Sequence, residues 1–104
     1  MRIRFQPVAE AELTEARLWY SLQSDGLDVV LMERVDEVLH RIVAAPESYP
    51  VAYRYLRRAL TRQFPYAIFY EVVDEEIIIF AIYHSRRDPK RLKARFSKTG
   101  PGLS

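Results

Sequence analysis

Six consecutive apolar residues, Ile77 to Ile82, constrain the fold of this 104-residue chain more than any other feature. Alternate side chains of a β-strand point to opposite faces, so this run would present apolar side chains on both faces of a sheet. A membrane-spanning helix needs about 20 apolar residues, many more than this run supplies. The run therefore predicts a central strand that helices cover on one face and another segment covers on the other.

Two amphipathic helices are predicted upstream of this strand. The first follows Pro7, which suits the first turn of a helix. The second follows the break at Ser24-Asp25-Gly26 and ends before Pro46, and Asp25 or Asp28 is expected to cap it. A break this short makes the helices antiparallel neighbours on one sheet face. The apolar stripes are Ala9, Leu13, Ala16 and Tyr20, and then Leu31, Val35, Val38 and Ile42.

Four extended runs are predicted to form the sheet. A turn at Val73-Asp74-Glu75-Glu76 joins the last two as a hairpin, and its register stays open because it lacks the Asn-Gly pair of the tightest turns. The place of the first run in the sheet also stays open. The runs are Arg2 to Phe5, Ala52 to Leu60, Phe64 to Val73 and Glu76 to His84.

The segment from Asp88 to Phe96 is the candidate to cover the second sheet face. Asp88-Pro89 resembles a helix start, and Leu92 and Phe96 lie four residues apart, on one side of such a helix. The second face would be an exposed apolar patch unless this segment or a partner chain covers it. A short C-terminal helix is therefore expected to lie against the sheet.

The expected fold class is α+β, with the order β-α-α-β-β-β followed by the short C-terminal helix. The helical hairpin would lie on a small, mostly antiparallel sheet. The length suits a single domain, which we place at residues 1–96. Residues 97–104 are expected to form a flexible tail.

The composition excludes several kinds of site. The chain has no cysteine, which rules out disulfides and thiolate metal centres. Three glycines do not form a phosphate-binding loop, and His40 and His84 lack a metal-binding spacing, so no metal and no cofactor is expected. No segment resembles a signal peptide or membrane span, so a soluble cytoplasmic protein is expected.

The charge is divided unevenly along the chain. Residues 1–50 hold 5 arginines and 9 acidic residues, a net charge of −4. Residues 51–104 hold 11 basic and 5 acidic residues, a net charge of +6. Such a division suggests an anionic partner for the second half, either a nucleic acid or an acidic protein, although a solvated basic face would look the same.

Two groups of basic residues could form a catalytic site. RNA cleavage by internal transfer needs a base, an acid and a cation, and no metal. His84 suits the acid or base role because its ordinary pKa lies near neutrality, with Arg57, Arg58 and Arg87 as its partners. Adjacent strands would bring the groups together. They consist of Arg54, Arg57, Arg58 and Arg62, and of His84, Arg86, Arg87, Lys90, Arg91, Lys93 and Arg95.

A binding surface is the alternative interpretation of the same residues. His84 would then only end a buried strand, while the arginines bind carboxylates and the tyrosines form a protein interface or stack on RNA bases. The candidates for binding are Arg54, Arg62, Tyr66, Tyr70, Arg86, Arg91 and Arg95. Trp19 and Tyr20 are expected to pack the first helix against the sheet or the second helix. His40 is expected to be solvated.

Four phrases occur in a characteristic order and spacing. They are Phe5-x-Pro7-x-Ala9-x-x-x-Leu13, Pro46-x-x-Tyr49-Pro50, Arg57-Arg58 running into Phe64-Pro65-Tyr66-Ala67-Ile68-Phe69-Tyr70, and His84-x-x-Arg87-Asp88-Pro89. Together they resemble the RelE/ParE toxin superfamily, and in particular its ParE-like, or plasmid stabilisation, branch. The resemblance runs from about Arg2 to Arg95.

The resemblance implies a toxin that a cognate antitoxin neutralises by folding a disordered C-terminal segment around it. An acidic, amphipathic segment would cover the apolar sheet face that the two long helices leave open and would neutralise the basic half. The candidate binding residues would then contact the antitoxin or the toxin's target. Members of the superfamily divide into RelE-like endonucleases, which cleave mRNA on the ribosome, and ParE-like inhibitors of DNA gyrase.

Departures from the nuclease pattern favour gyrase inhibition. RelE-like nucleases commonly carry Arg where this sequence has Ala67, and a Tyr or Lys set where it has Ser85 and Arg86. Some nucleases use a His near the end of the last strand, so His84 keeps mRNA cleavage as the alternative. A third interpretation is a scaffold that binds antitoxin without poisoning anything.

Overall fold

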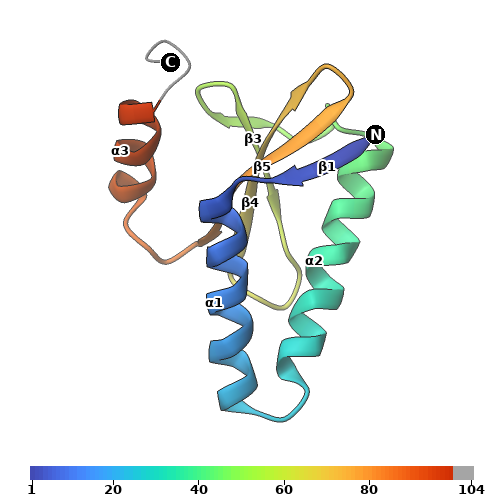
Figure 1. The fold of residues 1–104 in the computed structure, drawn as a ribbon, viewed down its shortest axis with the longest axis vertical. Coiled ribbons are helices and arrows are strands. Elements are labelled where there is room, and N and C mark those ends of the chain that lie inside the picture. Colours follow the sequence, from blue (N-terminus) through green and yellow to red (C-terminus); the bar gives the residue numbers. More distant parts are fainter. Residues whose placement is uncertain (100–104) are drawn as a thin grey trace.

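The computed structural model describes residues 1–99, with the side chains of residues 1–96. Figure 1 shows α1 and α2 as a hairpin of two long helices, with α3 on the opposite side of the molecule from α2. No helix within residues 1–99 combines the length and apolarity needed to cross a membrane. The elements are β1 (Arg2–Phe5), α1 (Pro7–Gln23), α2 (Leu27–Ala44), β2 (Val51–Tyr53), β3 (Leu56–Leu60), β4 (Tyr66–Val73), β5 (Glu76–His84) and α3 (Pro89–Thr99).

The strands form one sheet in the order β1-β5-β4-β3-β2. Three of the four pairings are antiparallel, and β1 pairs in parallel with β5. The predicted central strand is confirmed, because β5 lies between β1 and β4 and its residues Ile77, Ile79 and Ile82 are at most 2% exposed. The predicted α+β class and mostly antiparallel sheet are confirmed as well.

The helical hairpin covers one sheet face, as predicted. The α2 stripe from Leu31 to Ile42 is buried, and the α1 stripe is buried or partly buried against the same core. Tyr70 of β4 is fully buried in this core, and its hydroxyl donates to the carbonyl of Pro46 at 2.6 Å. This bond ties the loop after α2 to the sheet. Burial removes water from the phenol and raises the pKa of Tyr70 to about 12.

The C-terminal helix covers the other face, again as predicted. Leu92 and Phe96 of α3 are 5% and 4% exposed and contact Leu56, Phe69 and Ala81 of the sheet. Burying two such side chains contributes roughly 3–6 kcal/mol to the folded state. The helix continues to Thr99, over the first three residues of the expected tail. Residues 100–104 of that tail lie outside the described residues.

Two local predictions differ from the structure. The expected single strand Ala52 to Leu60 is divided into β2 and β3 by a tight turn, in which Arg54 adopts a left-handed conformation with φ 53°. The expected helix cap by Asp25 or Asp28 is wrong, because Gly26 caps α2 with φ 80° and no side chain bonds to the helix start. A left-handed residue suits Gly, which has no Cβ.

Candidate functional site

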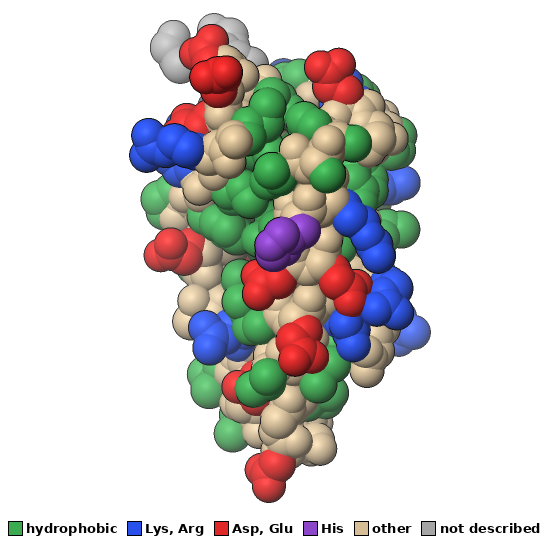
Figure 2. Space-filling model, turned by 90° about the vertical axis from the view of Figure 1, so that its right-hand side faces the viewer, with side chains coloured by type: hydrophobic (Ala, Val, Ile, Leu, Met, Phe, Trp, Pro, Cys, Tyr) green, Lys and Arg blue, Asp and Glu red, His purple; other side chains and the backbone are tan. Residues whose placement is uncertain are grey.

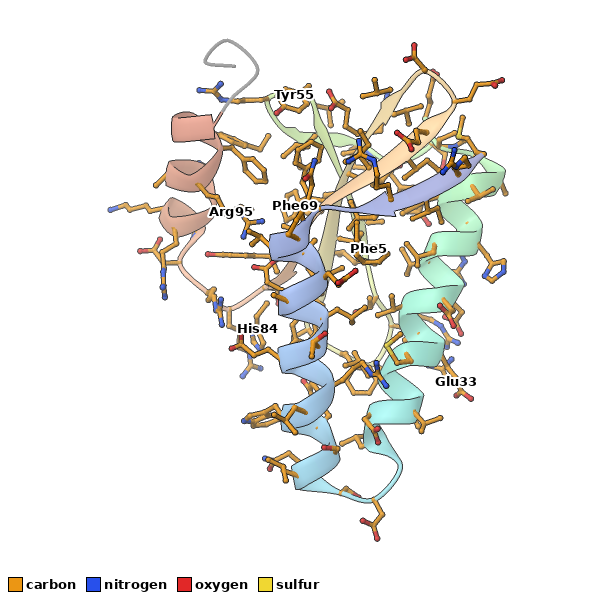
Figure 3. The ribbon with its side chains drawn as sticks, in the orientation of Figure 1. Phe5, Glu33, Tyr55, Phe69, His84 and Arg95 are labelled. Carbon is orange, nitrogen blue, oxygen red and sulfur yellow. The ribbon has the colours of Figure 1, made fainter. Side chains whose placement is uncertain are left out.

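A groove of about 550 Å³ lies between α1 and the end of β5. The floor includes Ala16 and Ile82 of the core, and the aromatic rings of Tyr20 and Tyr66 line it as well. His84 also lines the groove and lies beside α1 (Figure 3). The groove therefore joins the first helix to the loop that leads into α3.

Exposed apolar side chains form the α1 wall of this groove. Leu18, Trp19 and Leu22 are 61%, 56% and 75% exposed. The prediction that Trp19 packs α1 against the protein interior is wrong, whereas Tyr20 does so, against Phe64 and Tyr66. Neighbouring helix residues point about 100° apart, so Trp19 leaves the buried stripe that Tyr20 occupies. Contiguous exposed apolar residues of this kind mark interaction sites.

Positive charge lies on the opposite wall. Arg86 and Arg87 follow β5, line the groove and are exposed. Neither forms an ion pair with the residues the structure describes, although the Arg87 guanidinium lies 5.9 Å from the centre of the Tyr83 ring. The groove thus combines exposed apolar side chains with two guanidinium groups that form no described ion pair, and the carboxylates of Glu12 and Glu15 line it as well.

His84 has two defined contacts in the groove. Its ring meets that of Tyr66 edge to face at 5.3 Å, and its Nδ1 accepts a hydrogen bond from the backbone N–H of Arg86 at 3.1 Å. Burial, and then the neighbouring Tyr20, raise the pKa of Tyr66. A raised pKa makes the Tyr66 phenolate less accessible, which disfavours Tyr66 as the base of a nuclease.

His84 and the arginines of β3 do not meet as predicted, because β4 lies between β3 and β5, although Arg54 and Lys93 of the two groups lie around one tyrosine ring. Arg57 of β3 pairs with Tyr70 of β4, whereas His84 of β5 pairs with Tyr66 of β4. Tyr66 and Tyr70 are four residues apart, a distance of roughly 13 Å along a strand. The Arg57 guanidinium donates to the carbonyls of Glu47 and Tyr49 and so holds the loop after α2.

Arg58 is also separated from His84. It alternates with Arg57 along β3, so it lies on the α3 side of the sheet together with Leu56. The structure leaves Arg87 as the predicted catalytic partner that shares a groove with His84.

The predicted binding residues are divided among several environments. Tyr66 and Arg86 line the groove, Arg54 and Arg91 are exposed, and Tyr70 is fully buried and offers a partner no surface. His40 is exposed on α2, as predicted.

Arg62, another predicted binding residue, forms an ion pair with Glu37 of α2. Its Nε and Nη2 lie 3.0 and 2.7 Å from the two carboxylate oxygens. The hydrogen bond from Arg62, together with the charges of Arg62 and Arg34, holds the pKa of Glu37 at about 2. Arg62 therefore ties the loop after β3 to α2.

Arg95, the last of the set, belongs to a link that the sequence analysis missed. It donates to Glu12 of α1 at 3.1 Å and to the carbonyl of Phe80 at 2.6 Å, and Figure 3 shows it between α3 and α1. The other Glu12 oxygen accepts from the backbone N–H of Ile82 at 3.0 Å. Because β1 ends opposite Ile79, that stretch of β5 has no neighbouring strand on its β1 side. A glutamate beside the apolar stripe of a helix looks like a solvated residue, so the sequence does not predict that Glu12 bonds to Arg95 and Ile82.

Comparisons with known proteins agree on one family. A family model described as "ParE toxin of type II toxin-antitoxin system, parDE" matches residues 3–89. The Toxin ParE2 proteins of Mycobacterium tuberculosis strains CDC 1551 and H37Rv are each 31% identical over 97 residues, which is 92% of this chain and 92% of theirs.

A solved structure, of the chromosomal ParDE toxin–antitoxin system from P. aeruginosa, has the same fold. Its chain superposes with a TM-score of 0.68 at 18% identity, covering 81% of this chain and 95% of that one. At this identity the likeness supports the fold alone.

Proposed function

Because this chain belongs to the ParE toxin family of type II toxin–antitoxin systems, we propose that it inhibits DNA gyrase and is neutralised by a cognate antitoxin. The antitoxin would supply an acidic, amphipathic segment that folds on the toxin. Both the target and the antitoxin would be met in the cytoplasm. A role in plasmid stabilisation would follow from the same pairing.

The groove beside α1 is the observation that carries the antitoxin part of the proposal. Leu18, Trp19 and Leu22 expose apolar surface that an amphipathic helix or strand can bury. Arg86 and Arg87 face it without carboxylate partners, so acidic residues of the incoming segment would complete ion pairs. A segment that is disordered when free can wrap such a surface and fold on it.

The separation of Arg57 and Arg58 from His84 favours gyrase inhibition over mRNA cleavage. Neither Arg57 nor Arg58 can contact a phosphate that His84 also contacts, because a strand separates them and Arg58 lies on the other sheet face. Cleavage would then depend on His84, Arg87 and a protonated Tyr66. These three residues line the same groove, and their proximity supports a RelE-like endonuclease as the second candidate.

The test expresses the toxin alone in bacteria and follows mRNA 5′ ends and DNA damage signalling over the first minutes. We expect an early damage response with intact mRNA. His84→Ala separates the two candidates, with His40→Ala as a matched control at an exposed histidine. New mRNA 5′ ends that disappear with His84→Ala and persist with His40→Ala would replace our proposal with the nuclease. Normal growth without either signal would indicate a scaffold.

A further inference from the structure

Over residues 89–96 the outer surface of α3 is basic, and its exposed apolar side chains are the small Pro89 and Ala94. Lys90, Arg91 and Lys93 are exposed, while Leu92 and Phe96 point into the sheet. Residues 89–96 include no acidic side chain. Arg95 is held by Glu12, so it belongs to the inner side of the helix. The charged side chains that this surface exposes are therefore all positive.

The turn between β2 and β3 extends this surface through a tyrosine. The Tyr53 ring has the Arg54 guanidinium 5.7 Å and the Lys93 ammonium 6.0 Å from its centre. The Tyr53 hydroxyl also donates to the carbonyl of Lys93 at 3.4 Å. These contacts place the cations of two separate elements next to each other around one ring.

Arg58 adds a further exposed guanidinium on the same side of β3. We call the set Lys90, Arg91, Lys93, Arg54 and Arg58 the α3 basic surface.

Within the part of the chain whose side chains are described, no carboxylate forms an ion pair with this surface. Asp88 accepts a hydrogen bond from the backbone N–H of Lys90 at 2.9 Å and so caps the helix. Glu71 of β4 is partly buried, and burial raises its pKa. By contrast, the side of the molecule that carries α2 mixes acidic and basic side chains (Figure 2).

The lack of large exposed apolar side chains indicates which class of partner fits. Protein interfaces are built around buried apolar anchors, and lysine is depleted from their centres. None of the exposed large apolar side chains of the described chain lies on α3 or in the turn between β2 and β3. Nucleic-acid interfaces are instead polar and strongly positive, and phosphate contacts supply most of their non-specific affinity.

We propose that the α3 basic surface binds the phosphodiester backbone of duplex DNA. The choice of DNA over RNA rests on the proposed function, since gyrase works on duplex DNA. Tyr53 orders Arg54 and Lys93 around it, and the bound phosphates lie along the outer side of α3. The binding is independent of base sequence because the contacts are to the backbone.

The test measures binding of the full chain to a fluorescein-labelled DNA duplex of about 25 base pairs, by anisotropy between about 50 and 200 mM salt. Five phosphate contacts give a slope of log K against log salt of about −4.5. Replacing Lys90, Arg91 and Lys93 by Gln leaves two contacts and a slope of about −1.8, with affinity at low salt reduced at least about tenfold. Circular dichroism confirms that the variant folds.

A matched control removes the same total charge elsewhere. Arg2, Arg17 and Arg41 are exposed on β1, α1 and α2, and their triple Gln variant keeps the slope of the parent. If both triple variants lose affinity equally, net charge alone binds DNA and the surface is not a site. Tighter binding of an RNA duplex or of polyglutamate than of DNA also overturns the proposal.

A gyrase supercoiling assay on the same variants separates this inference from the proposed function. Inhibition by the parent chain without measurable DNA binding overturns the inference and leaves the function standing. DNA binding that is lost with the α3 variant, in a chain that does not inhibit gyrase, supports the inference and overturns the function.

Discussion

The α1 groove and the α3 basic surface differ in where their apolar side chains lie. In the groove, apolar side chains such as Trp19 are exposed, and guanidinium groups face them. On α3, the apolar side chains Leu92 and Phe96 are buried, and cations cover the outside. Both regions expose guanidinium groups, although Glu12 and Glu15 also line the groove, so the presence of arginine alone does not distinguish their partners. The position of the apolar residues does, because it favours a folding peptide for the groove and a polyanion for α3.

The largest effect is expected at the apolar wall of the groove. Trp19→Glu places a charge where the antitoxin would bury an aromatic anchor, so affinity for the cognate antitoxin falls at least about 100-fold, or roughly 3 kcal/mol. Val29→Glu is the matched control, since Val29 on α2 is also 56% exposed. Isothermal titration of both variants checks this. Equal affinities for the two variants would move the antitoxin site away from α1.

The ion pair between Arg95 of α3 and Glu12 of α1 should have the next largest effect, on the free energy of unfolding. Glu12→Ala removes the carboxylate to which the Arg95 guanidinium and the backbone N–H of Ile82 both donate, so the free energy of unfolding falls by about 2 kcal/mol. Glu15→Ala, at an exposed glutamate of the same helix, changes it by less than about 0.5 kcal/mol. Urea denaturation compares them. If Glu12→Ala unfolds like Glu15→Ala, the bonds of Glu12 to Arg95 and Ile82 do not stabilise the fold.

A smaller effect is expected at Tyr70, beneath the loop after α2. Tyr70→Phe removes the hydrogen bond to Pro46, and the free energy of unfolding at neutral pH falls by about 1 kcal/mol. Below pH 10 the phenol is neutral in both the folded and the unfolded chain. Between pH 10 and about 12 only the unfolded chain loses this proton, so stability falls as the pH rises through that range.

Denaturation at several alkaline pH values checks the Tyr70 prediction. The decrease in stability between pH 10 and 12 should be smaller in Tyr70→Phe than in the parent chain. If stability decreases equally in both chains, the titration of groups other than Tyr70 causes the decrease.

The smallest effect on stability is expected on α3. Gln at Lys90, Arg91 or Lys93 removes no buried contact, so each change alters the free energy of unfolding by less than about 0.5 kcal/mol. Urea denaturation of the single variants measures this. A loss above about 1 kcal/mol at any of them would mean that the α3 basic surface stabilises the fold rather than binding a partner.

Periodic apolar patterns carried most of the fold prediction. The run Ile77 to Ile82 predicted a strand buried on both faces, and Leu92 with Phe96 predicted the helix that covers one of them. Local spacing reports which side of an element is buried. It reports neither strand order nor the turn that divides β2 from β3 at Arg54, since that turn uses a conformation residues other than Gly seldom adopt.

The candidate site was less predictable for the same reason. Whether Arg57 and His84 meet depends on the strand between them, which is long-range information. Trp19 looked like a core residue because large aromatics usually are, and only its phase relative to Tyr20 reveals exposure. Glu12 became important through a sheet edge that ends opposite Ile79, which no local pattern encodes.

Gyrase supercoiling in vitro tests the central claim most directly. Purified toxin is added to gyrase, ATP and relaxed plasmid, and a second reaction also contains the cognate antitoxin. We predict that the toxin alone blocks supercoiling or traps cleaved DNA, and that the antitoxin restores supercoiling. Full supercoiling in the presence of a large excess of folded toxin would contradict the account.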